Sequence, residues 1–413
     1  QQTIISPSIA YNQSMISSLA LIQGDNKHNS FKQSLRGYEM SDFSFSNVAL
    51  RAFAAAAPNN VIKFDTSERR VAKFVKQMGI EQVHLSTTQQ TPLDLGYIAL
   101  SQALKQVNWK PQDLDLVIFD TQSPDFVGGI GDSSLLHHYL NLREDCAVFD
   151  LSAGCSAFPY SLTVACSMLQ GSLTIKRVAL LNGDLQWHAF NSREELLAQS
   201  QFLFGECTGA ILLEKVKPET CGIITTYLCA DGHGYQNLVL GPTARDSWHI
   251  DATHFIMPDG AKIEHHTGHP INYMNGMAIH EFSTGKVVDC IKKQYGKAIL
   301  DYDYYVFHQA NKQIVNIITD RLELDPSKVL ISVDQYGNTS AASALTTICH
   351  NLHDLTRPAH IFNASFGVGL SWGFSEFVIE PGTVSTIIST DHHFTEHCLK
   401  PVYDDPLAPA DQT

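Results

Sequence analysis

Basic residues are scarce in this sequence of 413 residues. Lysine and arginine together number 28, against 42 aspartate and glutamate residues, which gives a formal charge of −14. Nucleic-acid binding relies on a basic surface that neutralises phosphates, so the composition argues against a nucleic-acid partner. An acidic partner of another kind would need a local basic patch.

Long apolar runs are also missing, although 44% of the residues are hydrophobic. A membrane span needs about 20 consecutive apolar residues, and the longest candidates are broken by Gly, Ser or charged side chains. The short apolar stretch 16–21 has no basic cluster before it and no small-residue cleavage pattern after it, unlike a signal peptide. We therefore expect a soluble protein with no membrane span.

The nine cysteines form no C-x-x-C pair, which argues against zinc and redox motifs. An odd number of thiols fits a reducing, cytoplasmic location. Two histidine-rich stretches, 264–269 and 392–398, invite a metal interpretation, but Gly268 and Pro270 would break the helix that the first needs. Surface histidines are the better interpretation of both, and we expect no metal and no resident cofactor.

What the sequence does contain, from Val48 onward, is an alternation of β-rich runs and helical patterns, which is typical of an α/β protein. A helix is expected from Pro92 to about Val107, with Thr91 as its cap. Several expected strands are continuous apolar runs, as in central strands that are covered on both faces. The expected strands are Val48–Ala54, Leu114–Phe119, Ala147–Leu151, Arg177–Leu181, Ala210–Leu213, Gly222–Leu228, Tyr304–Phe307, Val329–Val333 and Ile361–Ala364.

A strand, a small-residue turn and a helix follow one another at 148–155 and again at 330–338, which hints at internal duplication. Outside the body, the first residues are rich in Ser, Asn and Gln. The residues after about Pro381 become polar, with further prolines at 401, 406 and 409. We divide the chain into an N-terminal extension, residues 1–46, two halves, residues 47–216 and 217–380, and a C-terminal tail, residues 381–413, which we expect on the surface.

Cys155 lies where the strand ending near Leu151 passes into a helix. Backbone N–H groups and the helix dipole at such a position lower the pKa of a thiol, and Gly154 and Ala157 leave room for a substrate. This context fits a nucleophile and a buried cysteine at a tight turn about equally well.

His308 and Asn338 are ambiguous when each is taken alone. His308 ends the apolar strand Tyr304–Phe307, where α/β folds place reactive groups, although a lone histidine there is more often structural. Asn338 lies in a Gly-Asn-Thr-Ser run that also suits a turn or a helix cap.

Three segments together resemble the signatures of β-ketoacyl-acyl-carrier-protein synthase III, in the same order and spacing. They are Asp150-Leu-Ser-Ala-Gly-Cys-Ser-Ala-Phe, His308-Gln-Ala-Asn and Tyr336-Gly-Asn-Thr-Ser-Ala-Ala-Ser. The match runs from about Val48 to Glu380. The resemblance implies a thiolase fold, in which duplicated α/β halves form a five-layered α-β-α-β-α sandwich, usually as a homodimer, with the site at the junction of the halves.

The resemblance also implies an acyltransferase mechanism. Cys155 accepts an acyl group from a thioester, and its own N–H and the Gly367–Gly369 loop stabilise the oxyanion. A malonyl-type thioester then loses carbon dioxide while His308 and Asn338 donate hydrogen bonds to the enolate oxygen. Biosynthetic thiolases use a second Cys at this point and hydroxymethylglutaryl-CoA synthases a Glu, so Asn338 favours decarboxylative condensation, in fatty-acid-like or polyketide biosynthesis.

The sequence departs from the family pattern at the positions that bind acyl-CoA. The segment Asp65–Ile80 has no Trp, and Lys73 and Gln77 stand where a Trp and an Arg are common. Gln313 replaces an Arg that often follows the His by five residues. We therefore expect the acyl donor to be an acyl-carrier-protein thioester or an unusual CoA ester.

Four further residues are candidates for binding. Phe126 begins a glycine-rich segment that resembles the loop reaching into the partner's acyl pocket, although a plain surface loop fits as well, and Phe366 is a second pocket candidate. Lys312 and Arg321 are candidates for carrier binding. Two other functions stay open: an acyltransferase that moves the acyl group from Cys155 to an alcohol or amine, and a non-catalytic partner subunit of a ketosynthase heterodimer.

Overall fold

The computed structural model describes residues 41–86, 90–126, 129–185, 203–218, 222–239, 254–256, 262–264 and 273–395. The fold below is that of the compact unit that begins at Ser41. Within the described residues, no helix is both long enough and apolar enough to cross a membrane.

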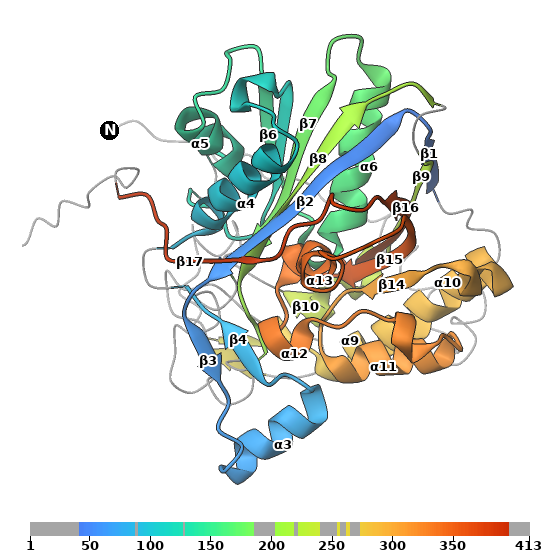
Figure 1. Cartoon of the computed structure of the whole chain (residues 1–413). Helices are drawn as coiled ribbons and strands as arrows, with labels where there is room; N and C mark the ends of the chain where they lie inside the picture. The colour runs from blue at the N-terminus through green and yellow to red at the C-terminus, as the bar shows by residue number, and fades with distance from the viewer. Residues whose placement is uncertain are drawn as a thin grey trace, which may run out of the picture. The chain divides into compact units, whose positions relative to one another are not determined.

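A six-stranded mixed sheet forms the centre of the first half (Figure 1). Its strands are, in order, β17 (Ile388–Thr390), β2 (Val48–Pro58), β8 (Cys207–Lys215), β7 (Arg177–Asp184), β5 (Leu116–Asp120) and β6 (Ala147–Leu151). β2, β8 and β7 are antiparallel neighbours, whereas β7, β5 and β6 run parallel. The expected strands of this half are therefore confirmed.

The second half contains a five-stranded sheet with the same pattern of directions. Its strands are, in order, β1 (Ser41–Phe45), β9 (Ile224–Ala230), β16 (Ser371–Ile379), β15 (Ala359–Gly367) and β14 (Tyr304–Phe307). In this sheet β9, β16 and β15 are antiparallel neighbours, and β15 then pairs in parallel with β14. In the first sheet β2, β8 and β7 are likewise antiparallel neighbours, and β7 then pairs in parallel with β5. This repeated topology is what a duplicated fold requires.

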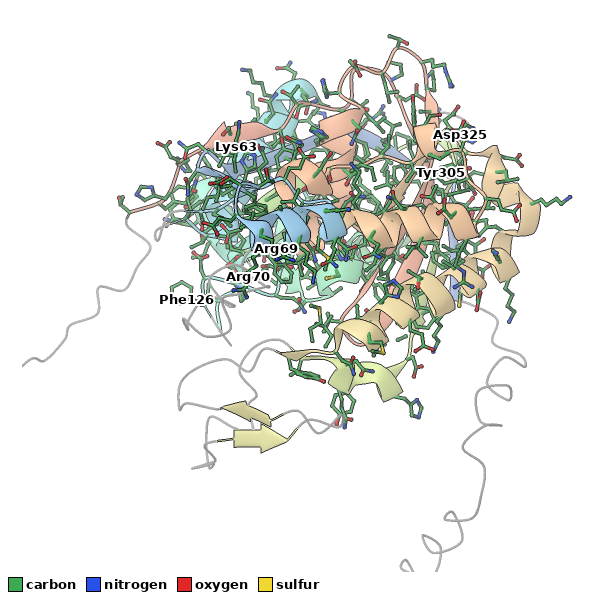
Figure 2. The ribbon with its side chains drawn as sticks, turned by 90° about the horizontal axis from the view of Figure 1, so that it is seen from below. Lys63, Arg69, Arg70, Phe126, Tyr305 and Asp325 are labelled. Atoms are coloured by element: carbon green, nitrogen blue, oxygen red, sulfur yellow. The ribbon has the colours of Figure 1, made fainter. Side chains whose placement is uncertain are left out.

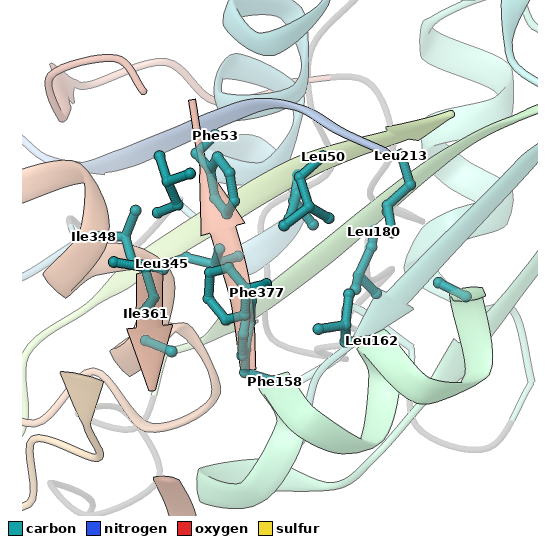
Figure 3. Close-up of a cluster of buried hydrophobic side chains, with 14 of the residues drawn as sticks. Leu50, Phe53, Phe158, Leu162, Leu180, Leu213, Leu345, Ile348, Ile361 and Phe377 are labelled. Carbon is teal, nitrogen blue, oxygen red and sulfur yellow. The ribbon is translucent and has the colours of Figure 1, made fainter. Parts of the chain in front are cut away.

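Two helices lie between the sheets, α6 (Ala157–Gly171) and α13 (Ser343–Asn351). Figure 3 shows the core that they share with both sheets: Phe158 and Leu162 come from α6, Leu345 and Ile348 from α13, and Phe53, Leu180, Ile361 and Phe377 from the strands. This layer holds the two halves together through buried apolar surface.

The outer layers complete the five-layered sandwich that we expected. α4 (Pro92–Gln106) and α5 (Asp132–Tyr139) cover the outer face of the first sheet in a second apolar cluster. α10 (Val287–Tyr295) and α11 (Lys312–Arg321) cover the second sheet, where Tyr295 meets Phe362 edge-on at 5.1 Å between ring centroids.

Smaller elements are β3 (Val61–Lys63), α3 (Arg69–Met78), β4 (Gln82–His84), β10 (Leu238–Val239), β11 (His254–Ile256), β12 (Lys262–Glu264), β13 (Tyr273–Met274), α9 (Gly276–Glu281) and α12 (Val333–Tyr336).

The strand expected at Val329–Val333 is wrong. Only a single parallel bridge joins Val329 to Tyr305, and Val333 already begins α12. The reason is a side chain that competes with strand pairing: Gln309 Oε1 accepts the backbone N–H groups of Ser332, at 3.1 Å, and Val333, at 3.3 Å. Backbone donors bound in this way are not available to a strand.

The chain on either side of the two halves also contributes to the sheets. β1 lies within the range that we assigned to the extension and pairs with β9, while β17 of the tail pairs with β2. Beyond β17, the Phe394 ring stacks on Tyr139 with 3.6 Å between centroids. The tail up to residue 395 is thus packed on the body, and the division into domains stays a prediction.

Candidate active site

A sharp turn after β6 presents Cys155. The short 3-10 helix Gly154–Ser156 passes directly into α6, so Cys155 sits at the N-terminal end of that helix, as expected. Gly154 has φ of +57°, and a Cβ on it would lie 2.5 Å from Gln122 Oε1, so only glycine fits this turn. The Cys155 side chain is buried, with 9% of its surface exposed.

The sulfur of Cys155 is surrounded by residues of the second half. Ser340 Oγ lies 3.7 Å from Cys155 Sγ, and the backbone N–H groups of Cys155 and Val368 form hydrogen bonds to the sulfur. Gly367 is so close that a Cβ there would lie 2.3 Å from Cys155 Cβ. The glycine loop therefore brings a second N–H donor, that of Val368, beside the reacting atom.

The expected lowering of the Cys155 pKa is wrong. Burial raises the pKa of the thiol to about 11, the Ser340 hydrogen bond lowers it, the Asp184 carboxylate raises it, and the two N–H groups lower it. Burial prevails because a thiolate loses its hydration in this enclosed position. The resting thiol is thus neutral at pH 7.

His308 lies directly after β14, where its backbone N–H donates to Ala364 O at 2.9 Å. Only 2% of the residue is exposed, and burial lowers the pKa of the imidazole to about 3. A neutral ring donates a single hydrogen bond. Its edge meets the Phe366 ring at 5.5 Å between centroids, and Phe366 adjoins Gly367, which touches Cys155.

Asn338 is held by both its backbone and its side chain. Its N–H donates to Leu203 O at 2.9 Å, and its carbonyl accepts from Gly205 N at 3.1 Å. Its side-chain Oδ1 accepts the Ser340 N–H at 2.9 Å. Since the amide oxygen is occupied, the Nδ2 donors are left for a substrate oxygen, and Ser340 joins Asn338 to Cys155.

Comparison with known proteins gives the family. Residues 149–232 match the family model described as 3-oxoacyl-[acyl-carrier-protein] synthase III, and residues 293–377 match that of its C-terminal part. The β-ketoacyl-[acyl-carrier-protein] synthase III of Trichodesmium erythraeum is 30% identical over 307 residues, which cover 73% of this chain and 87% of the relative. The chain belongs to the β-ketoacyl-acyl-carrier-protein synthase III family. The Methylococcus capsulatus relative is 29% identical over 323 residues, covering 76% of this chain and 94% of the relative.

Solved structures show the same fold. The 3-oxoacyl-(acyl-carrier protein) synthase of Burkholderia xenovorans superposes with a TM-score of 0.73 at 22% identity, covering 85% of this chain and 99% of that one. The priming β-ketosynthase of the R1128 polyketide pathway gives 0.66 at 22% identity, covering 84% and 99%. These structures show the thiolase fold. The sequence relatives show the reaction class, so this synthase III-like ketosynthase is an acyltransferase.

Two site residues of this ketosynthase escaped the sequence analysis, Asp184 and Ser340. Asp184 ends β7 with no exposed surface, and burial raises the pKa of its carboxyl group. It accepts hydrogen bonds from Gln122 N at 2.6 Å and Ala341 N at 3.2 Å, and from the Ser340 hydroxyl. The signal that was available is a carboxylate at the end of a buried strand, a position that favours function.

The remaining candidates are scattered. Phe366 is buried beside His308, and Phe126 is half-buried next to residues 127–128, which lie outside the described part. Lys312 pairs with Asp334 at 3.7 Å, and Arg321 binds Thr284 O and Asp289. These two cations stand about 13 Å apart along α11, so they form no common patch.

The histidine-rich stretches yield no metal site in the part of the chain that can be described. Residues 265–269, 397 and 398 lie outside it. Among the described residues, no group of three or more His, Cys, Asp or Glu side chains is arranged to hold an ion. His392 instead stacks on Tyr97 at 5.4 Å between centroids.

Proposed function

We propose that this ketosynthase carries an acyl group on Cys155 and extends it by decarboxylative Claisen condensation with a malonyl-type thioester. One observation carries the proposal: Ser340 touches the Cys155 sulfur and also binds the Asn338 side chain, while Phe366 and Gly367 connect His308 to the same sulfur. These contacts support a site in which a nucleophile, an imidazole and a carboxamide from the two halves act on the same substrate.

In the first step, the Cys155 sulfur attacks the carbonyl carbon of an acyl thioester. The N–H groups of Cys155 and Val368 donate to the oxyanion that forms, as they do to the sulfur in the resting state. The carbonyl re-forms as the bond to the carrier sulfur breaks, and the proton from Cys155 leaves on the released carrier thiol. The product is an acyl-enzyme thioester.

In the second step, the malonyl-type thioester loses carbon dioxide, and the electrons of the broken bond form an enolate. His308, neutral because burial lowers its pKa to about 3, donates one N–H to the enolate oxygen, and Asn338 Nδ2 donates another. The enolate carbon attacks the acyl carbonyl on Cys155, and the cysteine sulfur leaves as a thiolate that takes up a proton from water. Neither donor has to remove a substrate proton.

The test follows each step separately. Intact-mass measurement should show an acyl adduct on the wild type and none on Cys155→Ala. His308→Ala and Asn338→Ala should still be acylated, but their release of carbon dioxide from a malonyl thioester should fall about 100-fold or more, since one oxyanion donor is typically worth that factor.

Two other outcomes would contradict condensation. Transfer of the acyl group to an alcohol or amine, without carbon dioxide release, would establish the acyltransferase alternative. Failure of the wild type to be acylated by any thioester in a panel would instead favour a non-catalytic partner subunit.

We further propose an acyl carrier protein, or an unusual CoA ester, as the donor, and a pathway of fatty-acid-like or polyketide type. The segment Asp65–Ile80 has no Trp, and Lys73 and Gln77 stand where the family commonly has a Trp and an Arg, which supports this proposal. We also place the enzyme in the cytoplasm, which the free state of every cysteine in the described segments supports. No resident cofactor is needed for either step.

We propose, finally, that two copies form a homodimer through β6. This strand ends the order of the six-stranded sheet, and its apolar residues Val148, Phe149 and Leu151 are only half-buried. An open edge with apolar side chains is a template for pairing with another chain.

A further inference from the structure

The helix α3 carries a basic face in a strongly acidic protein. Its residues Arg69, Arg70, Lys73 and Lys76 are all exposed, and α3 contains no acidic residue. In Figure 1 it is the lowest helix, and in Figure 2, seen from below, it faces the viewer with Arg69 and Arg70 labelled. A formal charge of +4 on ten residues contrasts with −14 for the whole chain.

These cations are not used to hold the fold together. Within the described part of the chain, Arg69, Arg70, Lys73 and Lys76 have neither an ion-pair nor a hydrogen-bond partner, whereas Lys312 and Arg321 of α11 both have one. Arg69 and Arg70 also occupy the first turn, where a cation opposes the helix dipole. Cations at a position where they lower the stability of the helix indicate a functional constraint.

The spacing of the cations makes a ridge. Positions 69, 73 and 76 repeat with the helical period, so these three side chains share one face. The opposite face packs inward through Val71, which is buried, and through Phe74, which meets Phe64 edge-on at 6.0 Å between centroids. The ridge is about 10 Å long.

The C-terminal end of α3 and the residues just after it pack against the segments that carry His308 and Asn338. Gly79 ends the helix in the left-handed conformation, and a Cβ there would lie 2.4 Å from Lys312 Cβ, at the start of the helix that follows His308. Val83, just beyond, lies against Gly337, where a Cβ would come within 2.7 Å of its Cγ1. The basic face therefore lies next to the segments that carry His308 and Asn338.

A cavity of about 510 Å³ opens between α3, β3, β4 and α12. Its lining combines the apolar side chains of Phe64 and Val75 with the amides of Gln82 and Gln335 and the charged groups of Lys63 and Glu81. Gln335 precedes Asn338 by three residues. This mixture suits a substrate arm that carries amides on an apolar chain.

We propose that the α3 face, Arg69, Lys73 and Lys76 with Arg70 beside them, docks an acidic acyl carrier protein that delivers the thioester to Cys155. The proposal rests on the proposed function and adds its docking surface. A ridge of separate cations matches a broad acidic protein surface. A nucleotide would call for an aromatic platform as well, and the exposed positions of α3 offer none.

The test compares an acyl donor that is a carrier protein with an acyl donor that has no protein part. In the variant Arg69→Glu/Lys73→Glu/Lys76→Glu, acylation of Cys155 by an acyl carrier protein should fall about tenfold or more in kcat/KM, mainly through KM. Acylation by an acyl-pantetheine thioester, which has no protein part, should stay within about twofold of the wild type. Added salt should slow the wild type with the carrier protein and leave the variant nearly unchanged.

The matched control is Lys105→Glu/Lys292→Glu/Lys297→Glu, which makes the same charge change at exposed lysines on other elements. An unaltered rate of the α3 variant with the carrier protein, or an equal loss in the control, would overturn the proposal. So would a loss confined to acyl-CoA, which would make α3 a nucleotide site. A wild type that no thioester acylates would refute the proposed function instead.

Discussion

At the residue scale, the reactivity of Cys155 depends on burial acting against a small number of hydrogen bonds. Burial raises the pKa of the thiol to about 11, and Ser340 is the strongest group that lowers it. Ser340 is in turn held by Asp184, through its hydroxyl, and by Asn338, through its N–H. The fully buried carboxylate thus positions the serine that adjoins the sulfur.

This balance predicts the pH dependence of alkylation. A thiol pKa above the usual value means that the thiolate fraction keeps growing in base, so the rate of Cys155 carbamidomethylation by iodoacetamide should rise about tenfold per pH unit between about pH 8 and pH 10. Ser340→Ala removes a group that lowers the pKa and should slow the reaction at each pH. Peptide mass spectrometry follows Cys155, and a plateau below pH 8 would disprove the neutral resting thiol.

The three motif residues were identified from the sequence because their spacing matches a family, whereas Asp184 and Ser340 were not. Their roles depend on contacts between segments far apart in the chain, such as that of Asp184 with Ala341. No local pattern encodes such a contact. The lowered thiol pKa was mispredicted for a related reason, since burial is a property of the assembled halves.

At the element scale, strongly patterned segments were predictable. The helix from Pro92 begins after the expected cap Thr91, which forms a capping box with Asp94, and β6 and β14 have the expected bounds. Short or side-chain-dependent elements were not: β17 has three residues and exists through its pairing with β2. The helix α3 was also predictable, although it was not among the expected elements: Val71, Phe74, Val75 and Met78 repeat with the helical period.

The packing of β17 predicts that the tail contributes to stability. Truncation after Glu380 removes the β17–β2 pairing, the buried Val384 and the Phe394–Tyr139 stack. The loss should be about 3 kcal/mol or more in the free energy of unfolding, measured by denaturant titration. Truncation after Thr395 is the control, and equal stability of the two truncations would show that residues 381–395 contribute nothing.

At the scale of the whole molecule, the two sheets use their edges differently. The second sheet is extended at β9 by β1, and the first at β2 by β17, so one edge of each sheet is covered by chain from outside its half. The β6 edge of the first sheet receives no further strand from the described residues. β14 also ends its sheet, but an isolated bridge joins its Tyr305 to Val329, whereas no such bridge among the described residues involves β6. The β6 edge is therefore the one that we expect a second copy to complete.

Pairing through β6 predicts a dimer that a single edge substitution weakens. Light scattering should give about twice the chain mass of 45.7 kDa. Ala147 is exposed at the start of β6, and Ala147→Lys should shift the enzyme toward monomer because a lysine on an edge opposes strand addition. Ala298→Lys, at an exposed position after α10, should remain dimeric. A single-chain mass for the wild type at micromolar concentration would contradict the dimer. If the two variants keep the wild-type circular dichroism and have equal masses, the dimer contact does not lie at β6.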